Sequence, residues 1–408
     1  MKKKLLIILS ILGVVLILIG SIFLYLDYLE KEKIRNAIIK VELVENLEIE
    51  FNRELYLADL ISSINGELIN NFKIDTTKLG SKKIKFHFIN EEKIKVPYEF
   101  IINIVDKTPP VIWLGSTYSV NVGYNGDLTA NIMCGDNYDD NPKKEIIGEY
   151  NTSKIGTYPL IYKATDLNGN ETIKKFNLIV KKKSSGSSSP KKIKFNDIYQ
   201  TYKAYNTKIG LDVSKWQGNI DYDKVKEAGA EFVFIKVGGT NGINGDYYVD
   251  PKFKQNIEGF LEVGIPVGVY FYSYANSVDK AVKDAKWVIE QIKDYDVTLP
   301  IAYDWENWSS FNKFNMSFYK LTNSAKTFIK IVNDYGYEGI LYSSKSYLES
   351  IWQKGDYPVW LAHYTTKTNY EGDYSFWQMT SSCVIDGITA NTVDVNIMYL
   401  DNVNKNVN

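Results

Sequence analysis

The sequence predicts a membrane-anchored chain of several domains, in which two all-β sandwiches precede a C-terminal α/β barrel. Three observations lead to this prediction. Residues 5–26 form one continuous, uncharged apolar run. The motif DTTKLG at residues 75–80 recurs as NTSKIG at residues 151–156. Beyond residue 208, eight short apolar runs alternate with helix-like stretches, which is typical of a β/α barrel.

The apolar run near the N-terminus predicts a transmembrane helix, because about 20 apolar residues span a bilayer. A cleaved signal peptide is the alternative, but its apolar core is usually about 7 to 15 residues and ends at small residues. Residues 23–28 offer no such cleavage site. Lysines at positions 2 to 4 predict that residues 1–4 stay in the cytoplasm. We therefore expect a single-pass protein of the cell membrane, with the bacterial membrane as a partner and every later domain outside.

Residues 34–106 and 107–181 are predicted to be two copies of one small β sandwich, because short alternating apolar and polar runs fill both. In the second copy, DKTPPVI (residues 106–112), GTYPLIY (156–162) and ATDLNGN (164–170) resemble the motifs of bacterial immunoglobulin-like surface domains. The first copy is a degenerate version. We expect both to act as spacers, and residues 182–207, rich in Lys and Ser, to form a flexible linker.

The acidic stretch at residues 135–141 carries oxygen ligands of the kind that calcium prefers. Turn chemistry explains clusters of Asn and Asp equally well, and the spacing fits no ligand loop. We therefore expect no metal and no cofactor.

Four carboxylates occupy apolar runs or their ends in the barrel segment, residues 208–401. Asp212 and Asp304 end the first and fourth runs, Glu306 follows two residues later, and Asp394 lies in the last run. Groups at the carboxyl ends of barrel strands meet on one face. Crowded carboxylates oppose one another's ionisation, so one of them can stay protonated and act as a general acid. A single Asp at a strand end is usually a turn or a helix cap, but four favour glycoside hydrolysis.

Aromatic residues near the same strand ends are candidate substrate-binding groups, because aromatic rings suit the faces of sugars. Core packing is the alternative for each of them. The candidate substrate-binding residues are Trp216, Tyr270, Tyr272, Trp308, Trp360, Tyr364, Trp377 and Gln378.

The motifs of this segment resemble, in order, those of the family 25 glycoside hydrolases, the Chalaropsis-type lysozymes. They include IGLDVSKWQG (residues 209–218), FVFIKV (232–237), YDWE (303–306), VWLA (359–362), FWQMTS (376–381) and VDVN (393–396). The resemblance implies a flattened β/α barrel and hydrolysis of the β-1,4 bond between N-acetylmuramic acid and N-acetylglucosamine in peptidoglycan. It makes Glu306 the proton donor and Asp212, Asp304 and Asp394 its supporting carboxylates. The attacking group is then either a carboxylate or the substrate's own N-acetyl group.

One departure from the family pattern lies at residues 237–242, where VGGTNG lacks an acidic residue that many members carry. The net charge of −1 offers no field that would hold nucleic acid, so we expect no such partner. Two other functions compete with the enzyme. One is a non-catalytic, glycan-binding scaffold of the cell surface, which would not need the Asp304 and Glu306 pair. The other is an adhesin that acts through its immunoglobulin-like domains.

Overall fold

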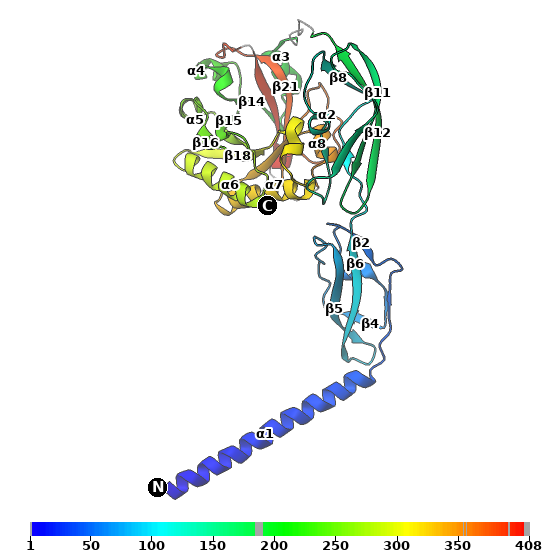
Figure 1. Cartoon of the computed structure of the whole chain (residues 1–408). Coiled ribbons are helices and arrows are strands. Elements are labelled where there is room, and N and C mark those ends of the chain that lie inside the picture. Colours follow the sequence, from blue (N-terminus) through cyan, green and yellow to red (C-terminus); the bar gives the residue numbers. More distant parts are fainter. Residues whose placement is uncertain (1, 184–190, 354, 356, 391, 404–408) are drawn as a thin grey trace. The chain divides into compact units, whose positions relative to one another are not determined.

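The computed structural model describes residues 2–183, 191–353, 355, 357–390 and 392–403 (Figure 1). The chain divides into two compact units, Met1–Thr108 and Pro109–Asn408. The first unit contains the N-terminal helix and one β domain. The second contains another β domain and the C-terminal barrel.

Helix α1 (Lys2–Asn36) opens the first unit and is longer than the predicted span of residues 5–26. Its segment Leu12–Asn36 has a mean hydropathy of 2.2 over its most apolar window, and none of that window is buried. The helix is therefore long and apolar enough to cross a membrane. Its length and composition fit either an anchor or a signal sequence.

The β domain of the first unit consists of a four-stranded sheet and a separate strand pair. The sheet has the order β2-β6-β5-β4, and β1 pairs with β3. Along β5, Ile84, Phe86 and Phe88 are buried while the residues between them are exposed, so alternation gives the sheet one apolar face. The strands are β1 (Val41–Leu43), β2 (Glu48–Glu50), β3 (Ile61–Ile64), β4 (Gly66–Leu68), β5 (Gly80–Asn90) and β6 (Lys95–Val105).

The β domain of the second unit repeats this plan, with the sheet order β10-β11-β12-β8 and the pair β7–β9. Strands β5 and β11 both begin at the glycine that ends the repeated motif, Gly80 in one copy and Gly156 in the other. Both β domains thus share one strand plan, whereas their boundaries and their immunoglobulin-like assignment stay predictions. The strands of this domain are β7 (Val111–Ile112), β8 (Thr117–Asn121), β9 (Cys134–Gly135), β10 (Lys143–Ile147), β11 (Gly156–Thr165) and β12 (Glu171–Lys181), with helix α2 (Leu128–Asn131).

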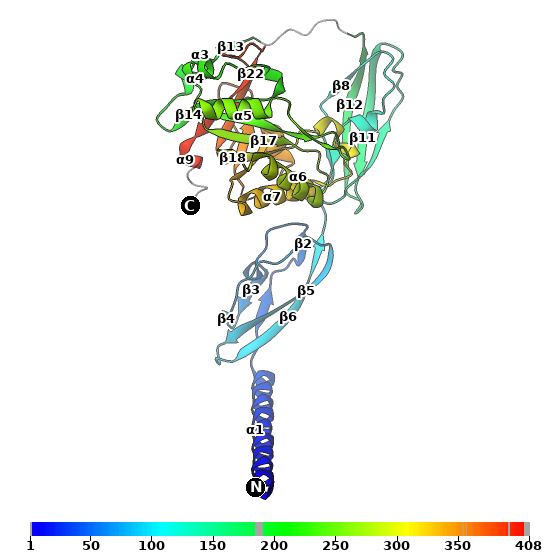
Figure 2. The same cartoon turned by 90° about the vertical axis from the view of Figure 1, so that its left-hand side faces the viewer.

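The C-terminal part is a closed eight-stranded barrel, as predicted (Figures 1 and 2). Seven strands run parallel to one another. The eighth, β22, closes the barrel between β21 and β14 and is antiparallel to both. The barrel strands are β14 (Thr207–Val213), β15 (Val233–Thr240), β17 (Val267–Tyr272), β18 (Val297–Asp304), β19 (Gly339–Ser344), β20 (Val359–Ala362), β21 (Phe376–Val384) and β22 (Val393–Tyr399), and β16 (Tyr247–Val249) pairs with β15.

Helices cover the outside of this barrel (Figure 2). The main ones are α4 (Tyr222–Glu227), α5 (Phe253–Glu262), α6 (Val278–Ile292), α7 (Phe318–Asp334) and α8 (Lys345–Ser350), with the short η2 (Lys215–Gln217), η3 (Trp308–Lys313) and α9 (Leu400–Val403). Helices α6 and α7 bury apolar residues at helical spacing, for example Ala285, Val288 and Ile292.

Odd-numbered and even-numbered strand residues face opposite sides of the barrel wall. One core cluster joins odd-numbered strand residues to buried residues of α5, α6 and α7, so these positions face the helices. The other cluster contains no buried helix residue and occupies the barrel interior. Its buried members are Phe232, Phe234, Ala302, Ile340, Tyr342, Trp360, Ala362, Phe376 and Met398. Even-numbered positions of the strands therefore point inward.

The barrel unit begins earlier than the sequence predicted. Strand β13 (Ile193–Lys194) pairs with β21, and α3 (Phe195–Tyr202) buries Phe195 and Ile198 in the outer core. The expected linker at residues 182–207 is therefore too long at its C-terminal end. Two apolar residues three positions apart are enough for one buried helix face, although Lys and Asn surround them. The rest of that expected linker includes residues 184–190, which lie outside the described residues.

Candidate active site

Three of the four predicted carboxylates lie on strands at one rim of the barrel. Asp212 is next to last in β14, Asp304 is last in β18, and Asp394 is second in β22. Because β22 runs antiparallel to its neighbours, its beginning lies at the rim where the parallel strands end. The strand register pairs Asp394 directly with Asp212. All three are even-numbered and continue the inward-facing rows of the strands.

Glu306 lies two residues beyond the end of strand β18. Strand β18 ends at Asp304, and the side chains on both sides of Glu306 are tied to the segment after β17. Trp305 Nε1 donates to the carbonyl oxygen of Ala275 at 3.1 Å, and Asn307 Nδ2 donates to that of Ser273 at 3.1 Å. Glu306 itself is exposed. The structure thus presents an accessible carboxyl group on a loop whose neighbouring residues are fixed.

Asp212 is held by two amide side chains. Its Oδ2 accepts from Gln378 Nε2 at 2.9 Å and from Asn396 Nδ2 at 2.8 Å. Asn396 Oδ1 in turn accepts from Trp360 Nε1 at 2.8 Å, and Gln378 Oε1 accepts from the hydroxyl of Tyr342 at 2.8 Å. Because both amide oxygens are occupied by donors, both amide nitrogens are directed at the carboxylate. This network fixes the position and favours the charged form of Asp212.

The carboxylates of the rim have raised pKa values. Burial raises the pKa of Asp212 to about 6, against the lowering effect of the two amide bonds. Burial, with the charges of Asp212 and Glu306, raises the pKa of Asp394 to about 8. Burial and the Glu306 charge hold the pKa of Asp304 well above its usual range. At neutral pH, Asp212 is thus the readiest of these three aspartates to ionise.

Glu306 also has a raised pKa, first because surrounding protein desolvates it and then because Asp212 is near. Lys236, on β15, opposes the rise at both Glu306 and Asp304. Its Nζ lies 4.7 Å from the ring centre of Tyr272 and 6.0 Å from that of Tyr270. A carboxyl group with a raised pKa beside a second carboxyl group is an arrangement that suits general acid catalysis.

Two hollows on the rim share one exposed aromatic residue. One, of about 770 Å³, is lined by Trp216, Lys236 and Tyr272 among others. The other, of about 420 Å³, is lined by Trp216, Tyr270, Asp212 and Asp394 among others. Trp216 is 75% exposed. Most of its ring is therefore accessible to a ligand that runs past the carboxylates, although Nζ of Lys215 lies 4.9 Å from the ring centre.

Tyr364 and Gln378 connect the rim aromatics to the carboxylates. Tyr364 is 57% exposed, and its hydroxyl donates to Gln378 Oε1 at 3.0 Å. Gln378 Nε2 also lies 3.2 Å from Oδ2 of Asp394. These two predicted residues, together with Trp216, Tyr270 and Tyr272, lie beside the acids.

Three predicted substrate-binding tryptophans are buried instead. Trp308, Trp360 and Trp377 are each at most 7% exposed, which leaves little ring surface for a sugar. Trp377 is odd-numbered and faces the outer layer, where its ring contacts Tyr202 edge-on. Trp360 points inward and acts on the site through its bond to Asn396. For these three, the structure favours core packing over direct contact with a substrate.

Residue parity would have found three site residues that the motif reasoning missed. Lys236, Tyr342 and Asn396 lie at even-numbered positions in the middle part of their strands. A polar or charged residue in an inward row that is otherwise Phe, Ala and Ile is the available signal.

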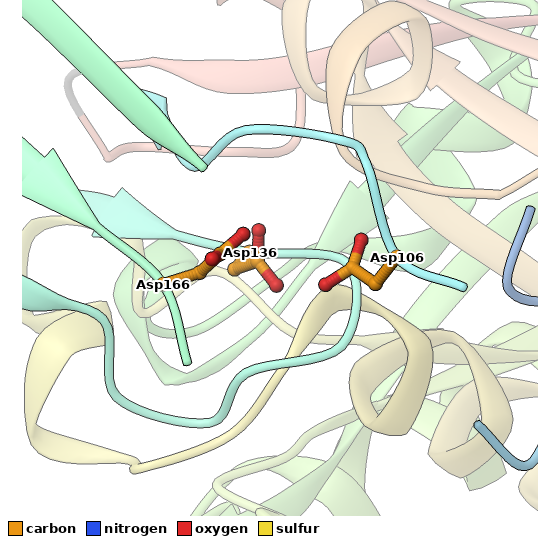
Figure 3. A group of neighbouring side chains, drawn as sticks. All are labelled: Asp106, Asp136 and Asp166. Carbon is orange, nitrogen blue, oxygen red and sulfur yellow. The ribbon is translucent and has the colours of Figure 1, made fainter. Parts of the chain in front are cut away.

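Figure 3 labels Asp136 and Asp166, two buried acidic residues of the second β domain. Oδ1 of Asp136 accepts backbone N–H bonds from Tyr138 and Asp139. Oδ1 of Asp166 accepts them from Asn168 and Asn170. These bonds are those of Asx-type turns, which was the alternative explanation for the acidic stretch. An acidic cluster alone does not identify an ion, and we assign none.

The raised pKa values predict that stability falls as the pH rises. The folded state holds the Asp394 proton more tightly than the unfolded chain does, because the pKa is about 8 rather than 3.8. The stabilisation from that proton is complete below pH 3.8 and is lost as the pH rises through about 8. We expect the melting temperature of the barrel to decline between about pH 5 and 9, and Asp394→Asn to flatten the alkaline part of that decline. Thermal denaturation at a series of pH values measures this decline. If the melting temperature of the variant fell with pH as steeply as that of the wild type, the assignment would be wrong.

Comparison with known proteins gives the family of the barrel. Residues 211–388 match the family described as "Glycosyl hydrolases family 25". The autolytic lysozyme of Clostridium acetobutylicum is 25% identical over 183 residues, covering 44% of this chain and 52% of that protein. Lysozyme M1 of Streptomyces globisporus is 40% identical over 68 residues, covering 17% of this chain and 21% of that protein.

Among solved structures, a family 25 glycosyl hydrolase from Bacillus anthracis is 23% identical, with a TM-score of 0.42. The match covers 52% of this chain and 95% of that one. The chain spans about half the length of the clostridial lysozyme that it matches.

Proposed function

Because residues 211–388 form a glycosyl hydrolase family 25 domain, we propose that this protein is a peptidoglycan hydrolase. In this proposal it is a lysozyme that cleaves the β-1,4 bond between N-acetylmuramic acid and N-acetylglucosamine. The observation that carries the proposal is the group of raised-pKa carboxylates at one rim of a closed barrel, with Glu306 exposed beside them. Glycoside hydrolysis needs this pairing of a protonated and an ionised carboxyl group.

Glu306 is the general acid in this mechanism. Desolvation by the surrounding protein and the nearby Asp212 raise its pKa, which favours the protonated form, and its exposure lets the proton reach the glycosidic oxygen. The fixed neighbours Trp305 and Asn307 limit the movement of the loop, which keeps the carboxyl group within reach of one oxygen atom.

Asp212 supplies the negative charge that stabilises the sugar's developing positive charge. Its lower pKa among the buried aspartates and its two amide donors support this role. Asp394 is its register partner and shares the Gln378 donor. An anion here serves either route of attack, by a carboxylate or by the substrate's N-acetyl group, which it would orient and polarise. Burial and the Glu306 charge raise the pKa of Asp304 well above its usual range, so its neutral form is favoured, which limits repulsion in the cluster.

The glycan strand lies across the two hollows that share Trp216. Sugar rings stack on that exposed indole and on the rim tyrosines Tyr270, Tyr272 and Tyr364. Lys236, between Tyr272 and the acids, faces the polar groups of the strand.

Helix α1 acts as a retained anchor in this proposal, with residues 1–4 inside and both later parts outside. We expect the full chain to sediment with membranes, to resist extraction by salt and alkaline carbonate, and to dissolve in detergent. Mass spectrometry of the mature N-terminus would show residues that precede the apolar run. A soluble product that begins after residue 26 would instead establish a cleaved signal sequence.

The test of function is digestion of purified peptidoglycan by the full chain in detergent. A hydrolase releases soluble glycan fragments that increase with time. A glycan-binding scaffold, which is the competing function, sediments with the peptidoglycan and releases nothing. The Glu306→Gln variant serves as the binding control, because it keeps the groove and loses the proton donor.

A further inference from the structure

The second β domain packs on the barrel segment that directly follows Glu306. Within the second unit, helix α2 and strand β9 of that domain lie against η3 (Trp308–Lys313). The ring of Trp113 in the same domain contacts Tyr347 of α8. The contact therefore involves loops that follow barrel strands at the rim of the carboxylates.

The β domain supplies hydrogen-bond partners for both polar atoms of one barrel side chain, that of Asn312. Its Nδ2 lies 2.8 Å from the carbonyl oxygen of Ile132, 3.0 Å from that of Ala130 and 3.1 Å from that of Thr129. Its Oδ1 accepts the backbone N–H of Cys134 at 2.9 Å. The amide thus satisfies carbonyl groups at the end of α2 that the helix itself leaves open.

The β domain also satisfies the start of helix α7. The N–H of Phe318 donates to the carbonyl oxygen of Asp136 at 2.8 Å, and the N–H of Ser317 donates to Asp140 Oδ1 at 3.0 Å. Lys320, one turn into the helix, pairs with the same Asp140 carboxylate. The first N–H groups of a helix have no partner within it, so these bonds tie α7 to the β domain.

The apolar part of this contact is packed like a protein interior. Met133 of the β domain is 7% exposed and belongs to the outer core cluster of the barrel. A Cβ atom on Gly135 would lie 2.5 Å from the ring of Phe318 and 2.7 Å from that of Phe311. A side chain at Gly135 therefore requires the rings of Phe311 and Phe318 to shift.

Aromatic rings continue the contact toward Glu306. Trp113 of the β domain lies with its ring centre 5.0 Å from that of Tyr347, which stacks on Trp308 at 4.0 Å. The rings of Trp308 and Trp305 meet edge-on, with their centres 4.8 Å apart. The backbone N–H of Trp308 donates to the carbonyl oxygen of Glu306 at 2.9 Å. A shift of the β domain would therefore reach the acid through a continuous series of packed rings.

We propose that residues 109–181 are a structural part of the catalytic unit rather than a spacer, and that they fix the loop that carries Glu306. Asn312 is a positioning residue in this account, because it acts on Glu306 through η3. The inference rests on the proposed function for its effect on catalysis, whereas its effect on the loop is independent of activity.

Two substitutions in the full chain test this inference, each at a different side of the contact. Gly135→Ala inserts a methyl group against Phe311 and Phe318. Asn312→Asp keeps the size of the side chain but replaces three amide contacts by repulsion between oxygen atoms. Gly115→Ala is the matched control, because it makes the same change in the same domain and its Cβ meets nothing within 4 Å.

We expect both contact variants to lower kcat on soluble glycan fragments by about tenfold or more, because a shift of about 1 Å can cost about 10²-fold. KM should stay within about twofold, because the groove around Trp216 lies outside this contact. The pH profile of kcat should move with the changed surroundings of Glu306. In hydrogen exchange, the peptide spanning residues 306–320 should lose protection in both variants and keep it in Gly115→Ala.

Hydrogen exchange separates failure of this inference from failure of the proposed function. If both variants lost protection at residues 306–320 but the wild-type protein did not cleave peptidoglycan, the contact between the β domain and this loop would be supported and the proposed activity would be wrong. Wild-type protection, kcat and pH profile in both Gly135→Ala and Asn312→Asp would overturn the inference even if the protein is an active lysozyme.

Discussion

Replacing Glu306 by glutamine is expected to lower kcat on peptidoglycan by about 10²- to 10⁴-fold, which is the usual contribution of a general acid. The amide keeps the shape and the exposure of the side chain but cannot give a proton to the leaving oxygen. The neighbouring bonds of Trp305 and Asn307 do not involve the Glu306 side chain, so the loop should keep its conformation. Release of soluble fragments measures the activity, and circular dichroism checks the fold.

The matched control is Glu371→Gln, an exposed glutamate on the loop between β20 and β21. It makes the same chemical change outside the carboxylate group and should leave kcat within about twofold. Equal rates for the Glu306 and Glu371 variants would show that another residue donates the proton.

Replacing Asp212 by asparagine is expected to lower kcat by about 10²-fold or more, the usual effect of removing one preorganised electrostatic group. The change keeps an oxygen that can accept the bonds from Gln378 and Asn396, so it removes the charge and little else.

The same variant should be at least as stable as the wild type above about pH 6. Burial raises the pKa of Asp212 from 3.8 to about 6, so the stabilisation from its proton is present below pH 3.8 and is lost as the pH rises through 6. Asparagine carries no such cost of ionisation. Activity and melting temperature should therefore move in opposite directions at pH 7, as they often do at strained sites.

Asp223→Asn controls for the loss of one negative charge, because Asp223 is exposed in the first turn of α4. It should change neither quantity appreciably. If Asp212→Asn kept wild-type turnover, or lost both activity and stability, the role of Asp212 as a buried anion would be wrong.

Local patterns predicted much of this architecture. The motif repeated at residues 75–80 and 151–156 predicted the two β domains, and eight apolar runs predicted the barrel. The acids Asp212, Asp304 and Glu306 were expected together because the carboxyl ends of parallel strands share one rim. Asp394 reaches that rim for a different reason, since β22 is antiparallel and begins there.

Contacts between distant segments were not predictable in the same way. Asn312 has no motif around it, and its partners lie far earlier in the sequence, in a domain expected to be a spacer. Trp360 and Trp377 looked alike in sequence, yet opposite parity sends one into the barrel and the other toward the helices. Parity could have separated these two tryptophans and identified Lys236, but only once the strand bounds were known.

The most direct test of the central claim is the chemical identity of the ends that digestion creates. Purified peptidoglycan is incubated with the full chain, reduced with borohydride and examined by mass spectrometry. Cleavage after N-acetylmuramic acid predicts new reduced muramic acid ends, formed by the wild type and absent with Glu306→Gln. Reduced glucosamine ends, or no new ends from a folded protein that binds peptidoglycan, would contradict the account.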